Sequence, residues 1–248
     1  MTTASEEDNG QPLVEHLIEL RRRLIWAAAG VLLCFLALVP FAQQIYAFVA
    51  RPLLDVLPEN TSMIATDVVA PFFVPLKVAA MAAFLLSLPN TLYQVWAFVA
   101  PALYRNEKRL LLPFVLSGVL LFAAGMAFCY FLVFPVAFKF FAGMTPQGVN
   151  MATDIGSYLS FVMSMFLAFG LTFEVPVVVV LLNYMGIVRL KTLQAARRYV
   201  IVAAFVIAAV FTPPDVLSQI MLALPMIALY EAGLWMCRFK RESDDDGN

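Results

Sequence analysis

Long apolar runs, separated by short polar or proline-containing segments, dominate the chain from about residue 24 onward. Most of these runs approach or exceed the roughly 20 apolar residues that a helix needs to cross a bilayer. Each run is therefore predicted to be a transmembrane helix. We expect six, over approximately residues 24–41, 71–99, 113–138, 158–184, 199–212 and 216–235.

The segments beside these runs carry their own signals. Residues 13–24, LVEHLIELRRRL, place apolar residues at helical spacing with charges between them, which predicts an interfacial helix that then turns into the membrane. Residues 42–70 are predicted to be a polar connection, and residues 189–198 a basic loop.

The fifth apolar run, residues 199–211, is shorter than the others and stops at the paired prolines Pro213 and Pro214, which cannot continue a helix. Its length of about 13 residues gives roughly 20 Å at about 1.5 Å per residue, against a hydrocarbon core of about 30 Å. We expect this hairpin to thin the bilayer locally or to pack against partner helices.

The composition agrees with the pattern. The chain is 62% hydrophobic and only 13% charged, whereas globular domains are near half apolar and a quarter charged. The sequence therefore predicts an all-α integral membrane protein without a soluble domain. We divide it into a disordered acidic N-terminus over residues 1–12, one six-helix membrane domain over residues 13–238, and a cytoplasmic tail over residues 239–248.

The positive charges predict the orientation of the chain. All but three of the 16 basic residues fall on one side of the six-span arrangement, the exceptions being Arg51, Lys77 and Lys139. Because Lys and Arg are enriched in cytoplasmic loops, both termini are expected in the cytoplasm.

One acidic residue, Glu174, lies inside the fourth predicted span. A carboxylate at such a position costs about 2.5–3.5 kcal/mol on insertion scales, so it is expected to be protonated, paired or facing a wet cavity. Pro176 frees a backbone carbonyl nearby, and Thr172 could help to satisfy the acid. A structural role, in which a protonated Glu174 only bridges helices, is the alternative.

Two further acids lie beside basic residues, in the helix 13–24 and in the loop after the second span. Glu107 could simply stabilise the first turn of the third helix, and Glu19 could pair with Arg22 or Arg23 on its own helix. Trp96 and Phe98 also have a structural alternative: they could form an interfacial aromatic belt.

Asp215 could likewise be only a cap on the last helix.

Catalytic motifs are absent from the sequence: it holds no nucleotide-binding loop, metal-ligand cluster or nucleophile–base arrangement, and His16 is its only histidine. We expect no enzymatic activity, cofactor, metal or nucleic-acid partner. Any energy source must be external, and the transmembrane proton gradient is the obvious candidate.

Several motifs in sequence order resemble the TatC family, the multispanning subunit of the twin-arginine protein translocase. These motifs cover nearly the whole chain, and they are HLIELRRRL (16–24), MIATDVVAPFFVPLK (63–77), YQVWAFVAPALYRNEKR (93–109), GMAFCYFLVFP (125–135), SYLSFVMSMFLAFGLTFEVP (157–176) and TPPDVLSQ (212–219). The resemblance implies six spans in a concave, glove-like arrangement with short fifth and sixth helices and both ends cytoplasmic, in a bacterial inner membrane.

The resemblance also implies a function: a receptor that binds twin-arginine signal peptides and assembles with copies of itself and with the single-span subunits TatA and TatB. Together they would export folded proteins with the proton-motive force. The matching positions for the signal peptide are Glu19, Glu107, Phe98 and Arg21. Those for the partners are Glu174, Thr212 and Gln219, and Pro52 and Asp215 match further motif positions.

Physical chemistry fits this resemblance, since a planar guanidinium can bind a carboxylate through two hydrogen bonds where lysine offers a point charge. Two arginines require two acids, and Glu19 and Glu107 meet that requirement. Two other functions stay open: a proton-coupled secondary transporter with Glu174 as relay, and an insertase subunit without signal selectivity. Replacing the paired arginines of a reporter by lysines separates them, because only a twin-arginine receptor should lose export.

Overall fold

The part of the chain that the structure describes is helical and contains no β-sheet. The computed structural model describes residues 7–56, 62–99, 108–144, 152–212 and 215–245. Five helices there are long and apolar enough to cross a membrane, and the number rises to six if a bent helix pair is one span. The prediction of an all-α membrane protein is confirmed.

The chain divides into two compact units, which we describe separately. Unit 1 comprises Met1–Pro40 and Ala79–Val119, and unit 2 comprises Phe41–Val78 and Leu120–Asn248.

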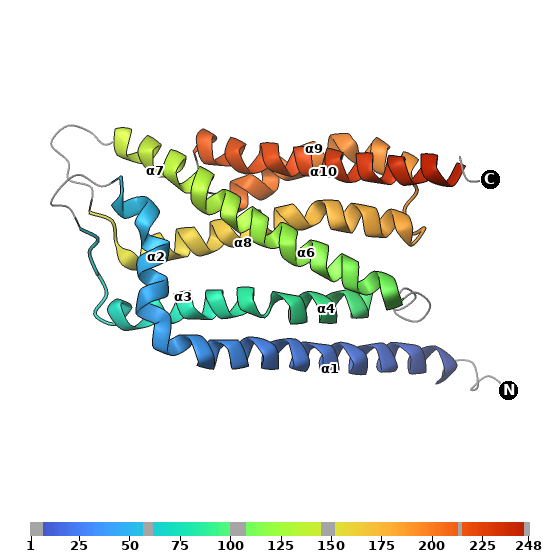
Figure 1. Ribbon diagram of the computed structural model, residues 1–248, viewed down its shortest axis with the longest axis horizontal. Coiled ribbons are helices and arrows are strands. Elements are labelled where there is room, and N and C mark those ends of the chain that lie inside the picture. The colour runs from blue at the N-terminus through green and yellow to red at the C-terminus, as the bar shows by residue number, and fades with distance from the viewer. Residues whose placement is uncertain (1–6, 57–61, 100–107, 145–151, 213–214, 246–248) are drawn as a thin grey trace. The chain divides into compact units, whose positions relative to one another are not determined.

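In unit 1, helix α1 (Glu7–Leu38) runs beside helix α4 (Leu88–Val99) (Figure 1). The two helices pack closely because Gly30 has no side chain: a Cβ there would lie 2.4 Å from the Asn90 amide nitrogen. That amide donates a hydrogen bond to the Trp26 carbonyl at 3.1 Å. The predicted turn between the interfacial helix and the first span is wrong, because no proline lies between Leu13 and Leu38 and the 32 residues of α1 form one helix.

Helices α3 (Ala70–Leu86) and α4 are the bent pair, and they meet at Ser87 at an angle of 57°. Helix α6 (Lys108–Phe128) follows the connection after α4. It continues through a five-residue π-helix, η2 (Cys129–Val133), into α7 (Phe134–Gly143), so that the third span is longer than the apolar run predicted.

In unit 2, helix α8 (Ile155–Tyr184) is the most buried of the candidate spans and packs against α9 (Leu190–Phe211) and α10 (Val216–Asp245). A Cβ at Gly233 of α10 would lie 3.1 Å from the Pro176 Cα, which shows how closely α10 approaches α8.

Two connections predicted to be irregular are helical. Helix α2 (Ala42–Leu54) occupies the start of the expected polar segment, and η1 (Val39–Phe41) precedes it. The expected basic loop over residues 189–198 belongs to α9 from Leu190 onward, because Leu193 is buried and the Tyr230 hydroxyl donates to its carbonyl at 2.7 Å. Helices α9 and α10 are therefore 22 and 30 residues long, longer than the short helices expected.

Asp154 fixes the start of α8 and a segment distant in sequence. One carboxylate oxygen accepts the Ser157 amide at 2.9 Å, and the other accepts the Thr66 amide and hydroxyl at 3.1 and 2.8 Å. These bonds, the Ser157 amide foremost, hold the pKa of Asp154 well below its usual range. The connection before α8 is thereby tied to the connection before α3.

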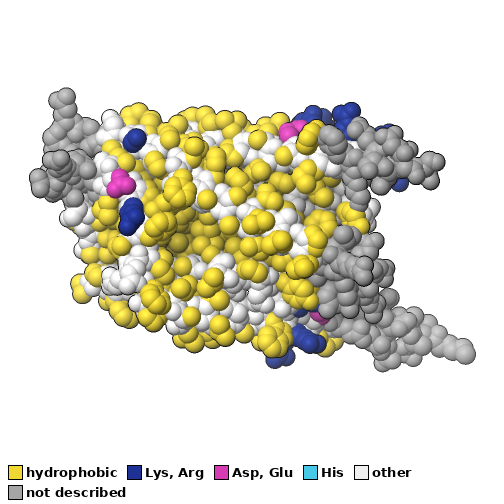
Figure 2. All heavy atoms as spheres, viewed as in Figure 1, with side chains coloured by type: hydrophobic (Ala, Val, Ile, Leu, Met, Phe, Trp, Pro, Cys, Tyr) yellow, Lys and Arg dark blue, Asp and Glu magenta, His cyan; other side chains and the backbone are white. Residues whose placement is uncertain are grey.

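Apolar side chains cover much of the face that Figure 2 shows. Large hydrophobic residues are exposed in both units, such as Leu33 in unit 1 and Val210 in unit 2, which are 71% and 74% exposed. Exposed apolar area on this scale is the expected property of helices that face lipid.

Candidate functional site

An open groove of ≈ 760 Å³ lies between α1 and α4 in unit 1. Charged, amide and aromatic side chains share its lining. The described residues that line it are Ile18, Glu19, Arg22, Arg23, Trp26, Tyr93 and Gln94. Trp26 and Tyr93 are exposed, as expected for aromatic residues at a membrane interface.

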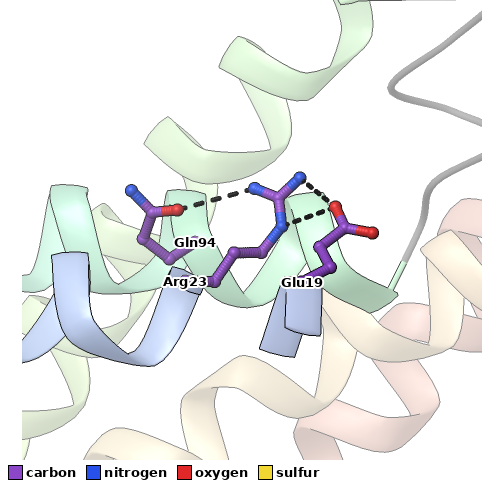
Figure 3. A network of polar contacts seen from close by, with 3 residues as sticks. All are labelled: Glu19, Arg23 and Gln94. Carbon is purple, nitrogen blue, oxygen red and sulfur yellow. Dashed lines mark hydrogen bonds and ion pairs between the residues drawn. The ribbon is translucent and has the colours of Figure 1, made fainter. Parts of the chain in front are cut away.

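Glu19, Arg23 and Gln94 form a hydrogen-bonded network in this groove (Figure 3). Glu19 Oε1 accepts from Arg23 Nε at 2.9 Å and from Arg23 Nη2 at 2.6 Å. Arg23 Nη1 faces the amide oxygen of Gln94, on α4, at 3.5 Å. The prediction that Glu19 pairs with an arginine of its own helix is confirmed for Arg23, four residues along.

The two members of the ion pair differ in exposure. The Glu19 side chain is 41% exposed and that of Arg23 only 16%. Arg23 is therefore packed between α1 and α4, while the carboxylate faces the open side of the groove. The partner available to a ligand is the acid.

Phe98 lies on the same pair of helices, beyond the groove. Its ring stacks on His16 of α1, with centroids 4.4 Å apart and planes at 20°. The neighbouring Trp96 is buried rather than exposed in an interfacial belt, so that alternative is wrong for Trp96. Its indole nitrogen is buried and has no hydrogen-bond partner among the described residues.

The remaining residues predicted for signal-peptide binding are Arg21 and Glu107. Arg21 is exposed on α1, next to the groove-lining Arg22. Glu107 lies outside the described residues. The prediction that Glu19 and Glu107 meet on one surface therefore stays a prediction.

Pro52 has a structural explanation in unit 2. It lies in the last turn of α2 and is buried. Because proline has no N–H, the Phe48 carbonyl four residues earlier loses its helical partner. The Tyr130 hydroxyl replaces that donor at 2.8 Å, and the Phe48 and Tyr130 rings stack with centroids 4.8 Å apart.

Tyr130 and Tyr158 are the residues that the sequence did not single out. Tyr130 lies in the π-helix η2, whose extra residue per turn changes the direction of its side chains. Tyr158 on α8 is buried and donates to the Val49 carbonyl at 2.8 Å. Both hydroxyls thus fix the end of α2, and no local sequence signal predicts either contact.

Glu174 is buried in α8, only 7% exposed. Neither carboxyl oxygen has a hydrogen-bond partner among the described residues. Thr172, which we expected to help satisfy it, is buried nearby in sequence but forms no such bond, and that prediction is wrong. The acid is thus an unusual buried polar group whose bonding capacity is unused.

Thr212, Asp215 and Gln219 of the α9–α10 hairpin have local bonds, whereas the buried Ser218 hydroxyl and one Asp215 oxygen have no hydrogen-bond partner among the described residues. The Thr212 hydroxyl donates to the Ala208 carbonyl at 2.8 Å, and the Gln219 amide donates to the Phe205 carbonyl at 3.1 Å. Asp215 accepts the Ser218 amide at 2.7 Å, which confirms that it caps α10. Gln219 therefore ties α10 to α9 beside the turn.

Comparisons with known proteins agree in pointing to one family. The family model of Sec-independent protein translocase protein (TatC) matches residues 15–225. TatC of Haemophilus influenzae is 50% identical over 242 residues, covering 98% of this chain and 94% of that protein. TatC of Escherichia coli K12 is 54% identical over 235 residues, covering 95% and 91%.

The fold agrees as well. A crystal structure described as the twin arginine translocase receptor TatC superposes with a TM-score of 0.79 at 36% identity, covering 90% of this chain and 98% of that one. A second structure of that receptor gives a TM-score of 0.80. With matches of this extent, the chain belongs to the TatC family and is a multi-pass membrane subunit of a twin-arginine protein translocase.

Proposed function

We propose that this chain is the signal-peptide receptor of its translocase, and that the α1–α4 groove binds the paired arginines of the signal peptide. One observation carries the proposal: Glu19 presents a half-exposed carboxylate in an open groove and already accepts two guanidinium hydrogen bonds there. The carboxylate is thus held in a geometry suited to arginine. Trp26 and Tyr93 provide apolar walls beside it for the hydrophobic part of a signal peptide.

A second carboxylate, Glu107, completes the proposed site. Two adjacent guanidinium groups carry two charges, and each is bound best by a carboxylate that takes both of its parallel N–H donors. Glu107 follows α4 in the chain by a short connection. Phe98 and Arg21 would flank the pair of acids on α4 and α1.

Peptide binding to purified variants tests this proposal. Glu19→Gln and Glu107→Gln should each weaken binding of a fluorescent twin-arginine signal peptide by about ten- to a hundredfold, because a hydrogen bond to a charged group contributes about 1.5–3 kcal/mol. The double variant should bind the twin-arginine peptide no better than it binds a peptide in which both arginines are replaced. Glu231→Gln is the matched control, since Glu231 lines a different groove. Unchanged binding by the double variant would refute the proposal.

We further propose that single-span TatA and TatB subunits pack against unit 2, at the α9–α10 hairpin and near Glu174. The unpartnered carboxyl of Glu174 offers a hydrogen bond that a partner helix could complete. Val210 and Val216, on either side of the turn, are 74% and 71% exposed and offer an apolar contact surface. Thr212 and Gln219 would act by fixing the shape of the hairpin, because their side chains bond locally.

Cysteine crosslinking tests the partner surface. Val210→Cys and Val216→Cys should crosslink to single cysteines in a TatA or TatB helix, whereas Leu33→Cys, equally exposed but on α1, should not. Labels at Val210 and Val216 that report only lipid would contradict this surface.

Membership of the TatC family supports a bacterial inner membrane, and the distribution of Lys and Arg supports cytoplasmic termini. In this orientation α1 and α4 would meet the signal peptide before export. Several copies of the chain, with the single-span subunits, would then move folded proteins with the proton-motive force.

A further inference from the structure

The groove that we propose for the signal peptide already contains a guanidinium. Arg23 donates two hydrogen bonds to Glu19, and both go to the same oxygen, Oε1. This is the chemical group that the twin-arginine ligand would bring. The inference that follows rests on the proposed function of the groove.

An incoming arginine binds a carboxylate most strongly when its two parallel N–H groups take both oxygens. Arg23 occupies one of these oxygens with two short contacts, so the full two-oxygen geometry is open only after Arg23 leaves Oε1. Ligand and Arg23 thus compete for one acid. Among the described residues that line the groove, Glu19 is the only acidic one.

Gln94 offers Arg23 an alternative hydrogen-bond acceptor. Its amide oxygen lies 3.5 Å from Arg23 Nη1, at the outer limit of a hydrogen bond (Figure 3). A small rotation of the guanidinium away from Glu19 would shorten this contact. Arg23 is also largely buried between α1 and α4, so it can stay packed while its head group changes partner.

The charge of the groove acts in the same direction. Among the described residues that line it, Arg22 and Arg23 are the two cations and Glu19 is the acid. A cationic ligand therefore meets a Glu19 carboxylate whose charge is already neutralised until Arg23 is drawn away from it. We propose that Arg23 is an internal competitor that occupies the signal-peptide site of the unliganded receptor, and that the signal peptide displaces it toward Gln94.

The alternative is that Arg23 positions Glu19 for the ligand, and the two roles predict opposite signs. An internal competitor lowers the apparent affinity, so Arg23→Gln should bind a twin-arginine peptide about two- to fivefold more tightly, the range that an exposed ion pair supplies. A positioning residue would make the same variant bind more weakly. Arg189→Gln is the matched control, because Arg189 is an exposed arginine at the start of α9 in unit 2.

A second variant keeps Arg23 and moves its partner, in case Arg23→Gln does not fold. Gln94→Glu gives Arg23 a carboxylate on α4, which should release Glu19 and also tighten peptide binding. The added charge could attract the peptide directly, so the two variants are combined. If Gln94→Glu acts through Arg23, the gains in affinity from Arg23→Gln and Gln94→Glu should be less than additive in the double variant. Direct attraction of the peptide would make the two gains additive and would contradict the competitor role.

The experiment is equilibrium binding of a fluorescent twin-arginine signal peptide to the full-length protein in nanodiscs, for wild type, Arg23→Gln, Gln94→Glu, the double variant and Arg189→Gln. Tighter binding by Arg23→Gln, lost again when Glu19→Gln is added, is the expected result. Unchanged or weaker binding by folded Arg23→Gln overturns the inference. If Glu19→Gln alone leaves wild-type binding intact, the proposed function of the groove fails instead, so the two failures are distinguishable.

Discussion

Two arginine–glutamate pairs in this molecule have similar chemistry and different geometry. In unit 1, Arg23 and Glu19 are four residues apart on α1, and the arginine uses one carboxylate oxygen. In unit 2, Arg197 of α9 and Glu231 of α10 join two helices, with Arg197 Nε on one oxygen and Nη2 on the other at 2.7 Å. The Glu19 and Glu231 side chains are equally exposed, at 41% and 40%, but the second pair uses both carboxylate oxygens, whereas the first leaves one oxygen for a ligand.

The role of each ion pair follows from the helices that it joins and from the carboxylate oxygen that it leaves unused. A pair within one helix adds little to the fold, about 0.3–0.5 kcal/mol, because the helix already fixes both residues. A two-oxygen pair between helices restrains their relative position. We therefore assign Glu19 to binding and Glu231 to holding the α9–α10 hairpin.

The largest expected effect comes from reversing the charge of Glu19, the acid with an unused oxygen. Glu19→Lys should weaken twin-arginine peptide binding by more than about tenfold, since it removes the acceptor and adds repulsion. The thermal unfolding temperature should change little. Glu231→Lys should show the reverse, with normal peptide binding and a lower unfolding temperature. Loss of peptide binding in both variants at once would erase the distinction between the two pairs.

The next largest effect is expected from the uncharged hydrogen bond between Tyr130 and Phe48, which has a purely structural role. Tyr130→Phe removes the donor to the Phe48 carbonyl and should lower the free energy of unfolding by about 0.5–1.5 kcal/mol. Adding Pro52→Ala restores a backbone N–H for that carbonyl, so the loss in the double variant should be smaller than the two single losses combined. Unfolding in nanodiscs, followed by tryptophan fluorescence, measures both. Strictly additive losses would argue against the link between Pro52 and Tyr130.

The smallest effect is expected from neutralising the interhelical pair. Glu231→Gln keeps the size of the side chain and should cost about 0.2–1 kcal/mol of stability, the range for exposed ion pairs. The cost should shrink at high salt, because screening weakens the pair in the wild type as well. Arg23→Gln is the comparison variant, and its cost should be at the low end of the same range. A larger cost for Arg23→Gln would mean that the pair within α1 is structural after all.

Hydropathy predicted the apolar helices because lipid imposes length and composition on each span independently of its neighbours. The same logic explains the errors. Residues 42–54 contain polar residues and Pro52, so they read as a connection, yet the proline lies in the last turn of α2 and removes only one hydrogen bond. Residues 190–198 read as a loop by charge, although Leu193 lies on a buried helical face.

The site was predictable only in part. The pairing of Glu19 with Arg23 follows from their spacing of four residues on one helix, and this spacing can be read directly from the sequence. The approach of Gln94, the stacking of Phe98 on His16 and the Tyr130–Phe48 contact join residues far apart in sequence, and they depend on tertiary packing that no local pattern encodes. The unpartnered state of Glu174 likewise appears only when its neighbours are known.

A thermodynamic cycle between receptor and ligand tests the central assignment of Glu19 most directly. Peptide affinities are measured for wild type and Glu19→Gln, each with a twin-arginine peptide and with a peptide in which one arginine is replaced by glutamine. We expect a coupling free energy of at least about 1 kcal/mol for one of the two arginines, and none when Glu231→Gln replaces Glu19→Gln. Zero coupling between Glu19 and both arginines would contradict the assignment of Glu19 to signal-peptide binding.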